Sequence, residues 1–189
     1  EILVGLVGSE MCIRDRGSVT DRKNPKIIIE SLETIDGDVS LEIIGQTPNL
    51  KYLKELNNLI SSSKYSERIT MTPFIEAEQL ISKYASANLF ILPSKSEGLG
   101  RVIIEAQATA CPVLVSSNTG MVDLIIENET GYIFENNNKN DLSNKIQYIM
   151  NNYESALQTG LNSKNFIKEN QSVANFEFGY KKLIDLVSI

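Results

Sequence analysis

The alternation of short apolar runs with helical patterns constrains the fold of this 189-residue chain more than any other feature. Leu89–Leu92 is a continuous apolar run, as expected for a strand covered on both faces. Further strands are expected at 41–44, 68–71, 113–115 and 131–134, and helices at 25–32, 50–60, 76–87, 101–110, 141–150 and 176–187. This order predicts an α/β fold with a Rossmann-like, doubly wound parallel sheet, whose ligand lies beyond the carboxyl ends of the strands.

The charge balance and the residues that are missing exclude several classes of function. Lys and Arg total 18 against 24 Asp and Glu, so the net charge of −6 disfavours nucleic acid as a partner. The chain has no histidine, which removes the commonest general base and His-based zinc sites. Its two cysteines, Cys12 and Cys111, are far apart and fit no disulfide framework. The isolated cysteines favour a reducing cytosol, and because no apolar run reaches roughly 20 residues, we expect a soluble, cytoplasmic protein.

The first sixteen residues do not fit the pattern that follows. Ile2–Val7 has the composition of a buried strand, but 9–16 shows no usable periodicity and resembles translated library-adapter sequence. The segment is interpreted either as a surface insertion or as a sequence artefact. The predicted domains are therefore 1–16 as a doubtful segment, 17–174 as one α/β domain, and 175–189 as a C-terminal helix.

Two carboxylates, Glu97 and Glu105, stand eight positions apart across a glycine-rich loop. The first follows the buried strand and the second falls in the first turns of the next helix, so both can face one crevice. Glycines allow the backbone to approach a ligand, and a helix N-terminus offers unpaired amides to a phosphate. Because carboxylates accept hydrogen bonds from sugar hydroxyls, the loop predicts a site for a phosphorylated sugar.

The segment from Leu92-Pro93-Ser94 to Glu105, with Ala106-Gln107-Ala108 after it, closely resembles the E-x7-E signature of a large retaining glycosyltransferase family, the family 4 type with the GT-B fold. The resemblance continues downstream through 111–134. Upstream, Gly17–Pro25 is similar to the family's loop after the first strand of the domain, where Lys23 matches a lysine. It implies that the chain is the C-terminal, donor-binding half of a two-domain GT-B enzyme.

The resemblance also implies roles for particular residues. Glu97 is expected to be catalytic and to contact hydroxyls of the donor sugar, while Glu105 holds the ribose hydroxyls. Lys23 is expected to be catalytic as well, because its charge balances the leaving diphosphate. The expected donor-binding residues are Gly17, Lys23, Glu97, Gly98, Leu99, Gly100 and Glu105.

The sequence departs from the family pattern at four positions. Ser18 stands where an arginine is usual, and Ala110 and Thr119 each replace a glycine. Asp123 replaces a glutamate. These departures affect the contacts with the phosphates and the donor loop.

The implied function is a hexosyltransferase-type enzyme that moves a sugar from a UDP-, GDP- or ADP-sugar to a glycan or lipid-linked acceptor with retention of configuration. No cofactor and no metal are implied, so cationic side chains and helix dipoles must stabilise the leaving group. Polysaccharide biosynthesis is a plausible setting. The acceptor site and any peripheral membrane attachment would reside in a missing N-terminal domain, so the fragment alone is expected to be inactive.

Three other interpretations are weighed against this one. Asp36-Gly37-Asp38 has the D-x-D form that holds a metal in a different glycosyltransferase fold, but its position before a strand favours a turn. A nucleotide-sugar epimerase shares the two-domain architecture, although the lack of histidine counts against it. A non-catalytic nucleotide-sugar-binding fragment is the third.

Overall fold

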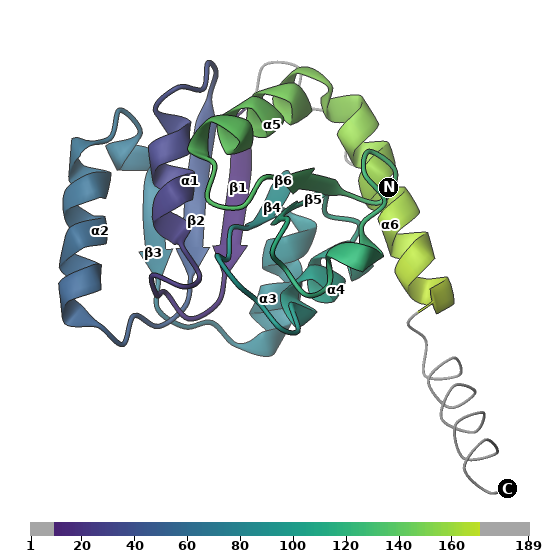
Figure 1. Ribbon diagram of the computed structural model, residues 1–189, viewed down its shortest axis with the longest axis horizontal. Helices are drawn as coiled ribbons and strands as arrows, with labels where there is room; N and C mark the ends of the chain where they lie inside the picture. Colours follow the sequence, from purple (N-terminus) through teal and green to yellow (C-terminus); the bar gives the residue numbers. More distant parts are fainter. Residues whose placement is uncertain (1–9, 171–189) are drawn as a thin grey trace, which may run out of the picture.

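The computed structural model describes residues 10–170, and a six-stranded parallel sheet lies at its centre (Figure 1). The strands are β1 (Met11–Arg16), β2 (Val39–Ile44), β3 (Ile69–Thr72), β4 (Leu89–Leu92), β5 (Val113–Ser116) and β6 (Tyr132–Phe134). They lie in the order β3-β2-β1-β4-β5-β6 and every neighbouring pair is parallel. The order reverses between β1 and β4, which makes this the switch point of a doubly wound sheet. The predicted fold class is confirmed.

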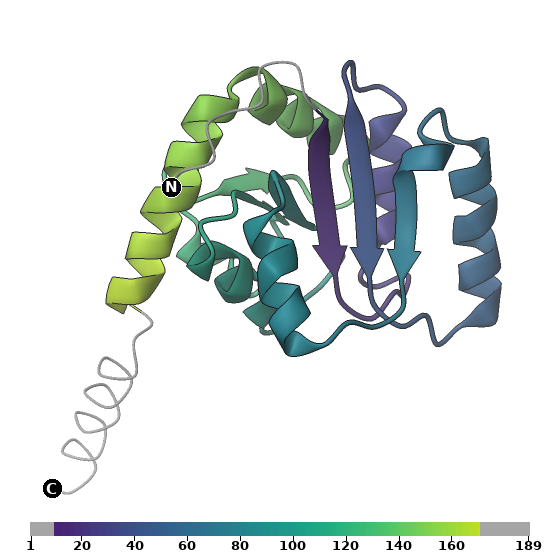
Figure 2. The ribbon, with the colours of Figure 1, turned by 180° about the vertical axis from the view of Figure 1, so that it is seen from behind.

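Helices cover both faces of the sheet (Figures 1 and 2). They are α1 (Pro25–Leu32), α2 (Leu50–Ser62), α3 (Ala77–Ala85), α4 (Arg101–Ala108), α5 (Lys139–Asn151) and α6 (Tyr153–Asn170). Strand β4 shows why both faces are apolar: Leu89 and Ile91 pack in the core under α1 and α5, whereas Phe90 and Leu92 pack in the core under α3 and α4. The prediction that this strand is buried on both sides is confirmed.

Strand β1 corrects the expectation for the N-terminal segment. Met11–Arg16 pairs with β2 along its whole length, and Ile13 and Arg14 also pair with β4. The interpretation of these residues as a surface insertion is therefore wrong, and the sheet begins before the predicted domain boundary at Gly17. The interpretation as a sequence artefact stays a prediction. The expected strand at 2–7 and the expected helix at 176–187 lie outside the described residues.

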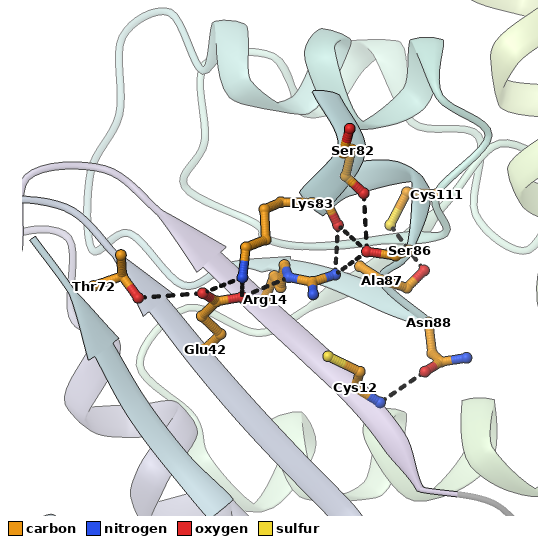
Figure 3. A network of polar contacts seen from close by, with 10 residues as sticks. All are labelled: Cys12, Arg14, Glu42, Thr72, Ser82, Lys83, Ser86, Ala87, Asn88 and Cys111. Carbon is orange, nitrogen blue, oxygen red and sulfur yellow. Dashed lines mark hydrogen bonds and ion pairs between the residues drawn. The ribbon is translucent and has the colours of Figure 1, made fainter. Parts of the chain in front are cut away.

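A polar network fixes α3 to three neighbouring strands (Figure 3). Glu42 of β2 accepts hydrogen bonds from Arg14 at 2.9 Å, from Lys83 at 2.7 and 2.9 Å, and from Thr72 at 3.2 Å. Arg14 also donates to Ser86 at 3.2 Å. Burial raises the pKa of Glu42, but the hydrogen bonds from Lys83 and Arg14 outweigh it and hold the pKa below its usual value. The positive charges of Arg14 and Lys83 therefore balance the carboxylate of Glu42. These bonds hold α3 in a defined position over the sheet.

Helix α6 was not expected from the sequence. It buries small residues such as Ala156, and a Cβ placed on Gly160 would lie 2.2 Å from the carbonyl oxygen of Ala110. The helix thus packs closely against the chain that follows α4. Within residues 10–170, no helix has the length and apolar character needed to cross a bilayer.

The Asp36-Gly37-Asp38 motif lies between α1 and β2, at the amino end of β2. Gly37 has a φ of 129°, a left-handed conformation that favours glycine, and Asp38 forms an ion pair with Arg68. The motif is a turn at the edge of the sheet opposite the strand ends described below, as expected. Cys12 and Cys111 are free thiols, in agreement with the absence of a disulfide framework.

Candidate functional site

The carboxyl ends of the strands surround a cavity of about 650 Å³. Figure 2 shows the arrowheads of β1, β2 and β3 at the same end of the molecule. The lining residues come from the ends of β1 and β2, from the segments that follow β1, β2 and β3, from α3, and from the loop before α4 and its first turns: Arg16, Gly17, Ser18, Lys23, Ile44, Gly45, Gln46, Pro73, Phe74, Ile75, Leu80, Leu99, Gly100, Arg101, Val102 and Glu105. The cavity is therefore beside the switch point between β1 and β4, where an open α/β sheet binds its ligand.

Lys23 reaches the site from the turn after β1. The turn ends at Asn24, which has a left-handed φ of 57°, and Pro25 then begins α1 with the φ that a first helical turn requires. The lysine side chain runs past Gly17, where its Cε lies 3.6 Å from the position of a glycine Cβ. Its Nζ forms an ion pair with Glu97.

Glu97 is held by the backbone of the loop after β4. Glu97 pairs with Thr119 in an isolated parallel β-bridge. The backbone carbonyl oxygen of Glu97 also accepts a hydrogen bond of 2.6 Å from the amide of Gly120. A Cβ on Gly120 would lie 2.0 Å from the carbonyl oxygen of Gly98, so only glycine allows the two loops this approach. The loop after β5 thus fixes the loop that carries Glu97.

The Glu97 side chain is covered by cations. Its Oε2 accepts from Lys23 and lies 3.4 Å from Ser94 Oγ and 3.7 Å from Arg22 Nη1. Only 10% of the side chain is exposed, and Glu97 is absent from the residues that line the cavity. The carboxylate therefore lies behind Lys23 as seen from the cavity.

Glu105 faces the cavity from α4 and is held from two sides. Arg16 Nη1 donates to its Oε2 at 3.1 Å, and the hydroxyl of Tyr84 donates to the same oxygen at 3.0 Å. The Glu105 side chain is 41% exposed. It is therefore an oriented carboxylate that a ligand can reach.

Arg101 is the first residue of α4 and lies exposed at the cavity. No side chain or carbonyl within residues 10–170 forms a hydrogen bond or an ion pair with its guanidinium group. Lys23 and Arg16 are each paired with a glutamate. Among the cationic side chains that line the cavity, Arg101 is therefore the one that has no ion-pair partner within the described residues.

The residues predicted from the sequence meet at this site with two exceptions. Gly17, Lys23, Leu99, Gly100 and Glu105 line the cavity, whereas Glu97 and Gly98 do not. Sequence reasoning missed four polar residues: Arg16, Gln46, Tyr84 and Arg101. Arg16 belongs to the segment treated as doubtful, and Tyr84 is on a helix that gave no signal of function. The basic residue that follows the paired glycines was the available signal for Arg101.

Comparison with known proteins identifies the family. The model of the family Glycosyl transferases group 1 matches residues 16–166. An uncharacterized glycosyltransferase of Methanocaldococcus jannaschii is 30% identical over 155 residues, which cover 81% of this chain and 42% of the relative. The capsular polysaccharide biosynthesis glycosyltransferase CapM of Staphylococcus aureus is 31% identical over 153 residues, covering 79% of this chain and 37% of CapM. The chain thus spans less than half the length of these relatives.

Solved structures share the fold. Anabaena HepE in complex with UDP and glucose superimposes with a TM-score of 0.83 at 20% identity, covering 95% of this chain and 49% of HepE. The C-terminal domain of a glycosyl transferase group 1 family protein, LpcC of Francisella tularensis, gives a TM-score of 0.77 at 20% identity and covers 87% of this chain and 86% of that domain. From the match over 16–166, the chain belongs to the group 1 glycosyl transferase family.

Proposed function

We propose that this chain is the C-terminal, donor-binding half of a retaining, hexosyltransferase-type enzyme that transfers a sugar from a nucleoside-diphosphate sugar to a glycan or lipid-linked acceptor. The observation that carries the proposal is the meeting of Lys23 and Glu97 at the switch point of the sheet, beside the cavity that Glu105 faces. At the carboxyl ends of the strands, the cation can bind the phosphates of such a donor, and the two carboxylates can bind its sugar and ribose hydroxyls.

The proposed donor lies with its diphosphate between Lys23 and the start of α4. Lys23 supplies one positive charge, Arg101 supplies a second, and the amides of the first turn of α4 add a partial positive charge. These groups would stabilise the negative charge that develops on the departing nucleoside diphosphate. In this proposal, Arg101 supplies the positive charge that an arginine at the position of Ser18 supplies in other members of the family.

The two glutamates bind hydroxyl groups in this proposal. Glu105 accepts hydrogen bonds from the ribose, since its carboxylate is open to the cavity. Glu97 accepts from the donor sugar once the diphosphate draws Lys23 away from it. The bond between the anomeric carbon and the diphosphate oxygen then breaks, and the acceptor oxygen bonds to that carbon on the face that the leaving group vacates. The proton of the acceptor hydroxyl passes to the departing diphosphate.

The acceptor site belongs to an N-terminal domain that lies outside this sequence. The chain covers 42% and 37% of the two relatives above, and its fold matches a structure named as a C-terminal domain. The chain by itself would therefore bind donor without transferring the sugar. The name of CapM favours a setting in polysaccharide biosynthesis, and UDP in the HepE structure makes UDP-sugars the first donors to test.

Transfer by the complete enzyme is expected to be independent of divalent metal and to retain the anomeric configuration. Activity should be unchanged after exhaustive chelation with EDTA, because side-chain cations and a helix N-terminus take the place of a metal. The anomeric proton coupling in the NMR spectrum of the product should match that of the donor. Activity that returns only when Mg²⁺ or Mn²⁺ is added, or a product of opposite configuration, would contradict the proposal. A free epimerised sugar would favour the epimerase instead.

A further inference from the structure

The two carboxylate oxygens of Glu105 differ in their contacts with the protein. Tyr84 and Arg16 both donate to Oε2. Within residues 10–170, no group donates to Oε1. Since the carboxylate lines the cavity, the oxygen without a protein partner is the one available to a ligand.

Tyr84 is a more rigid partner than Arg16. The tyrosine is 2% exposed, and its ring packs edge-on against Phe90 of β4 with the ring centroids 5.3 Å apart. Helix α3, which carries it, is tied to the sheet by the network around Glu42 (Figure 3). The side chain of Arg16 is 36% exposed and long, so it can follow Glu105 rather than fix it.

The hydroxyl of Tyr84 acts as a donor. A carboxylate accepts but does not donate, so the proton of this hydrogen bond comes from the phenol. Burial, and then the neighbouring charge of Glu105, raise the pKa of Tyr84 above its ordinary value. The phenol therefore keeps its proton at any pH at which the protein is studied.

We infer that Tyr84 is a positioning residue that aims Glu105 at the ribose and thereby lets the site distinguish ribonucleotides from deoxyribonucleotides. The inference rests on the proposed function, because it needs a nucleotide in the cavity. Tyr84 touches no reacting atom. It acts by holding the Glu105 carboxylate in the rotamer that offers Oε1 to a ribose hydroxyl.

The test compares the dissociation constants of UDP, 2′-deoxy-UDP and 3′-deoxy-UDP on the full chain by titration calorimetry, with GDP and ADP and their deoxy forms in parallel. The wild-type chain should bind at least one ribonucleotide more tightly than a deoxy form of it. Tyr84→Phe keeps the ring but removes the donor, so it should weaken ribonucleotide binding by about tenfold. Binding of the deoxy form should barely change, and the ratio of the two constants should approach one.

Two further variants separate this role from general stability. Tyr132→Phe removes another buried tyrosine hydroxyl, which contacts Thr159 and not the cavity, and should leave the ratio unchanged. Glu105→Ala should abolish the discrimination, and adding Tyr84→Phe to it should have no additional effect on the ratio.

The outcomes are distinguishable. If the wild-type chain binds ribonucleotides but Tyr84→Phe keeps the full discrimination, the role of Tyr84 is overturned and the proposed function stands. The role is equally overturned if the wild-type chain binds ribo and deoxy forms alike. If no nucleotide binds, the proposed function fails, and the inference fails with it.

Discussion

Glu97→Gln in the complete enzyme is expected to lower kcat/KM for sugar transfer by about 10²–10³-fold, the loss typical when a group that stabilises a transition state is removed. The substitution keeps the size of the side chain but removes the charge that pairs with Lys23. The amide also accepts hydrogen bonds from sugar hydroxyls less strongly than a carboxylate does.

In the present chain, Glu97→Gln should strengthen the binding of the nucleotide alone, although it lowers transfer in the complete enzyme. Lys23 would no longer be paired, so UDP should bind more tightly than to the wild-type chain. UDP-glucose should lose the additional affinity that its sugar provides. This difference in sign follows from the position of Glu97 behind Lys23.

Glu55→Gln provides the matched control. It makes the same change of charge at a glutamate that pairs with a lysine, Lys26, at 2.5 Å, but on α2 and away from the cavity. It should alter neither transfer nor nucleotide binding. If Glu97→Gln retained wild-type transfer, or weakened UDP as much as UDP-glucose, the assigned role of Glu97 would be wrong.

Asp15→Val is expected to stabilise the chain by up to about 4 kcal/mol near pH 8. Asp15 lies on the central strand β1, is 5% exposed, and shares its face of the strand with the buried Ile13. Burial raises the pKa of Asp15 from 3.8 to about 7, against the opposing effects of Lys23 and the Arg16 amide. A shift of about 3 units corresponds to roughly 4 kcal/mol.

The sign of the pH dependence follows from proton binding. Between pH 4 and 7 the unfolded chain has an ionised Asp15 while the folded chain keeps the proton, so the folded state binds more protons. The contribution of Asp15 to the free energy of unfolding therefore falls as the pH rises through this range, and it stays low above pH 7. Valine removes this dependence and suits a central parallel strand.

The measurement is urea unfolding of the wild-type chain and Asp15→Val at intervals from pH 4.5 to 8. The difference between the two should grow with pH and level off near pH 7. Asp123→Asn, at an exposed position, should run parallel to the wild type. A constant difference between wild type and Asp15→Val across the range would contradict the assigned titration.

Strand β1 also explains where prediction from the sequence failed. A central parallel strand is covered on both faces and is usually an apolar run, as Leu89–Leu92 is. Arg14 and Asp15 interrupt that pattern in β1, although both are buried. Their charges concealed the strand from a search for apolar runs.

Helix α6 escaped prediction for a different reason. Its buried positions include Thr159 and Gly160, whose side chains give little apolar signal. Close packing, not a stripe of large residues, holds it against the chain near Ala110. The remaining helices, and the strands other than β1, were predictable because their apolar residues form continuous runs or repeat with clear periods.

For the site, the sequence could predict the loops but not the contacts. Parallel strands bring their carboxyl ends together, so Lys23 after β1 and Glu97 after β4 were expected at one edge. The contact of Tyr84 with Glu105 depends on where α3 lies over the sheet, and the polar network at Glu42 sets that position. Lys23 covers Glu97 because of how the two side chains are oriented, and no local sequence pattern predicts that orientation.

Thermal unfolding of the 189-residue chain with UDP, GDP, ADP and their common sugar conjugates tests the central claim most directly. A nucleotide at about 100 times its dissociation constant should add about 2.7 kcal/mol and raise the Tm by roughly 5–10 °C. One base should be selective, and Glu105→Ala should cut the shift to roughly half at the same nucleotide concentration, as a tenfold weaker dissociation constant requires. If no nucleotide or nucleotide sugar raised the Tm, or if Glu105→Ala kept the full shift, the assignment of this cavity as the donor site would be contradicted.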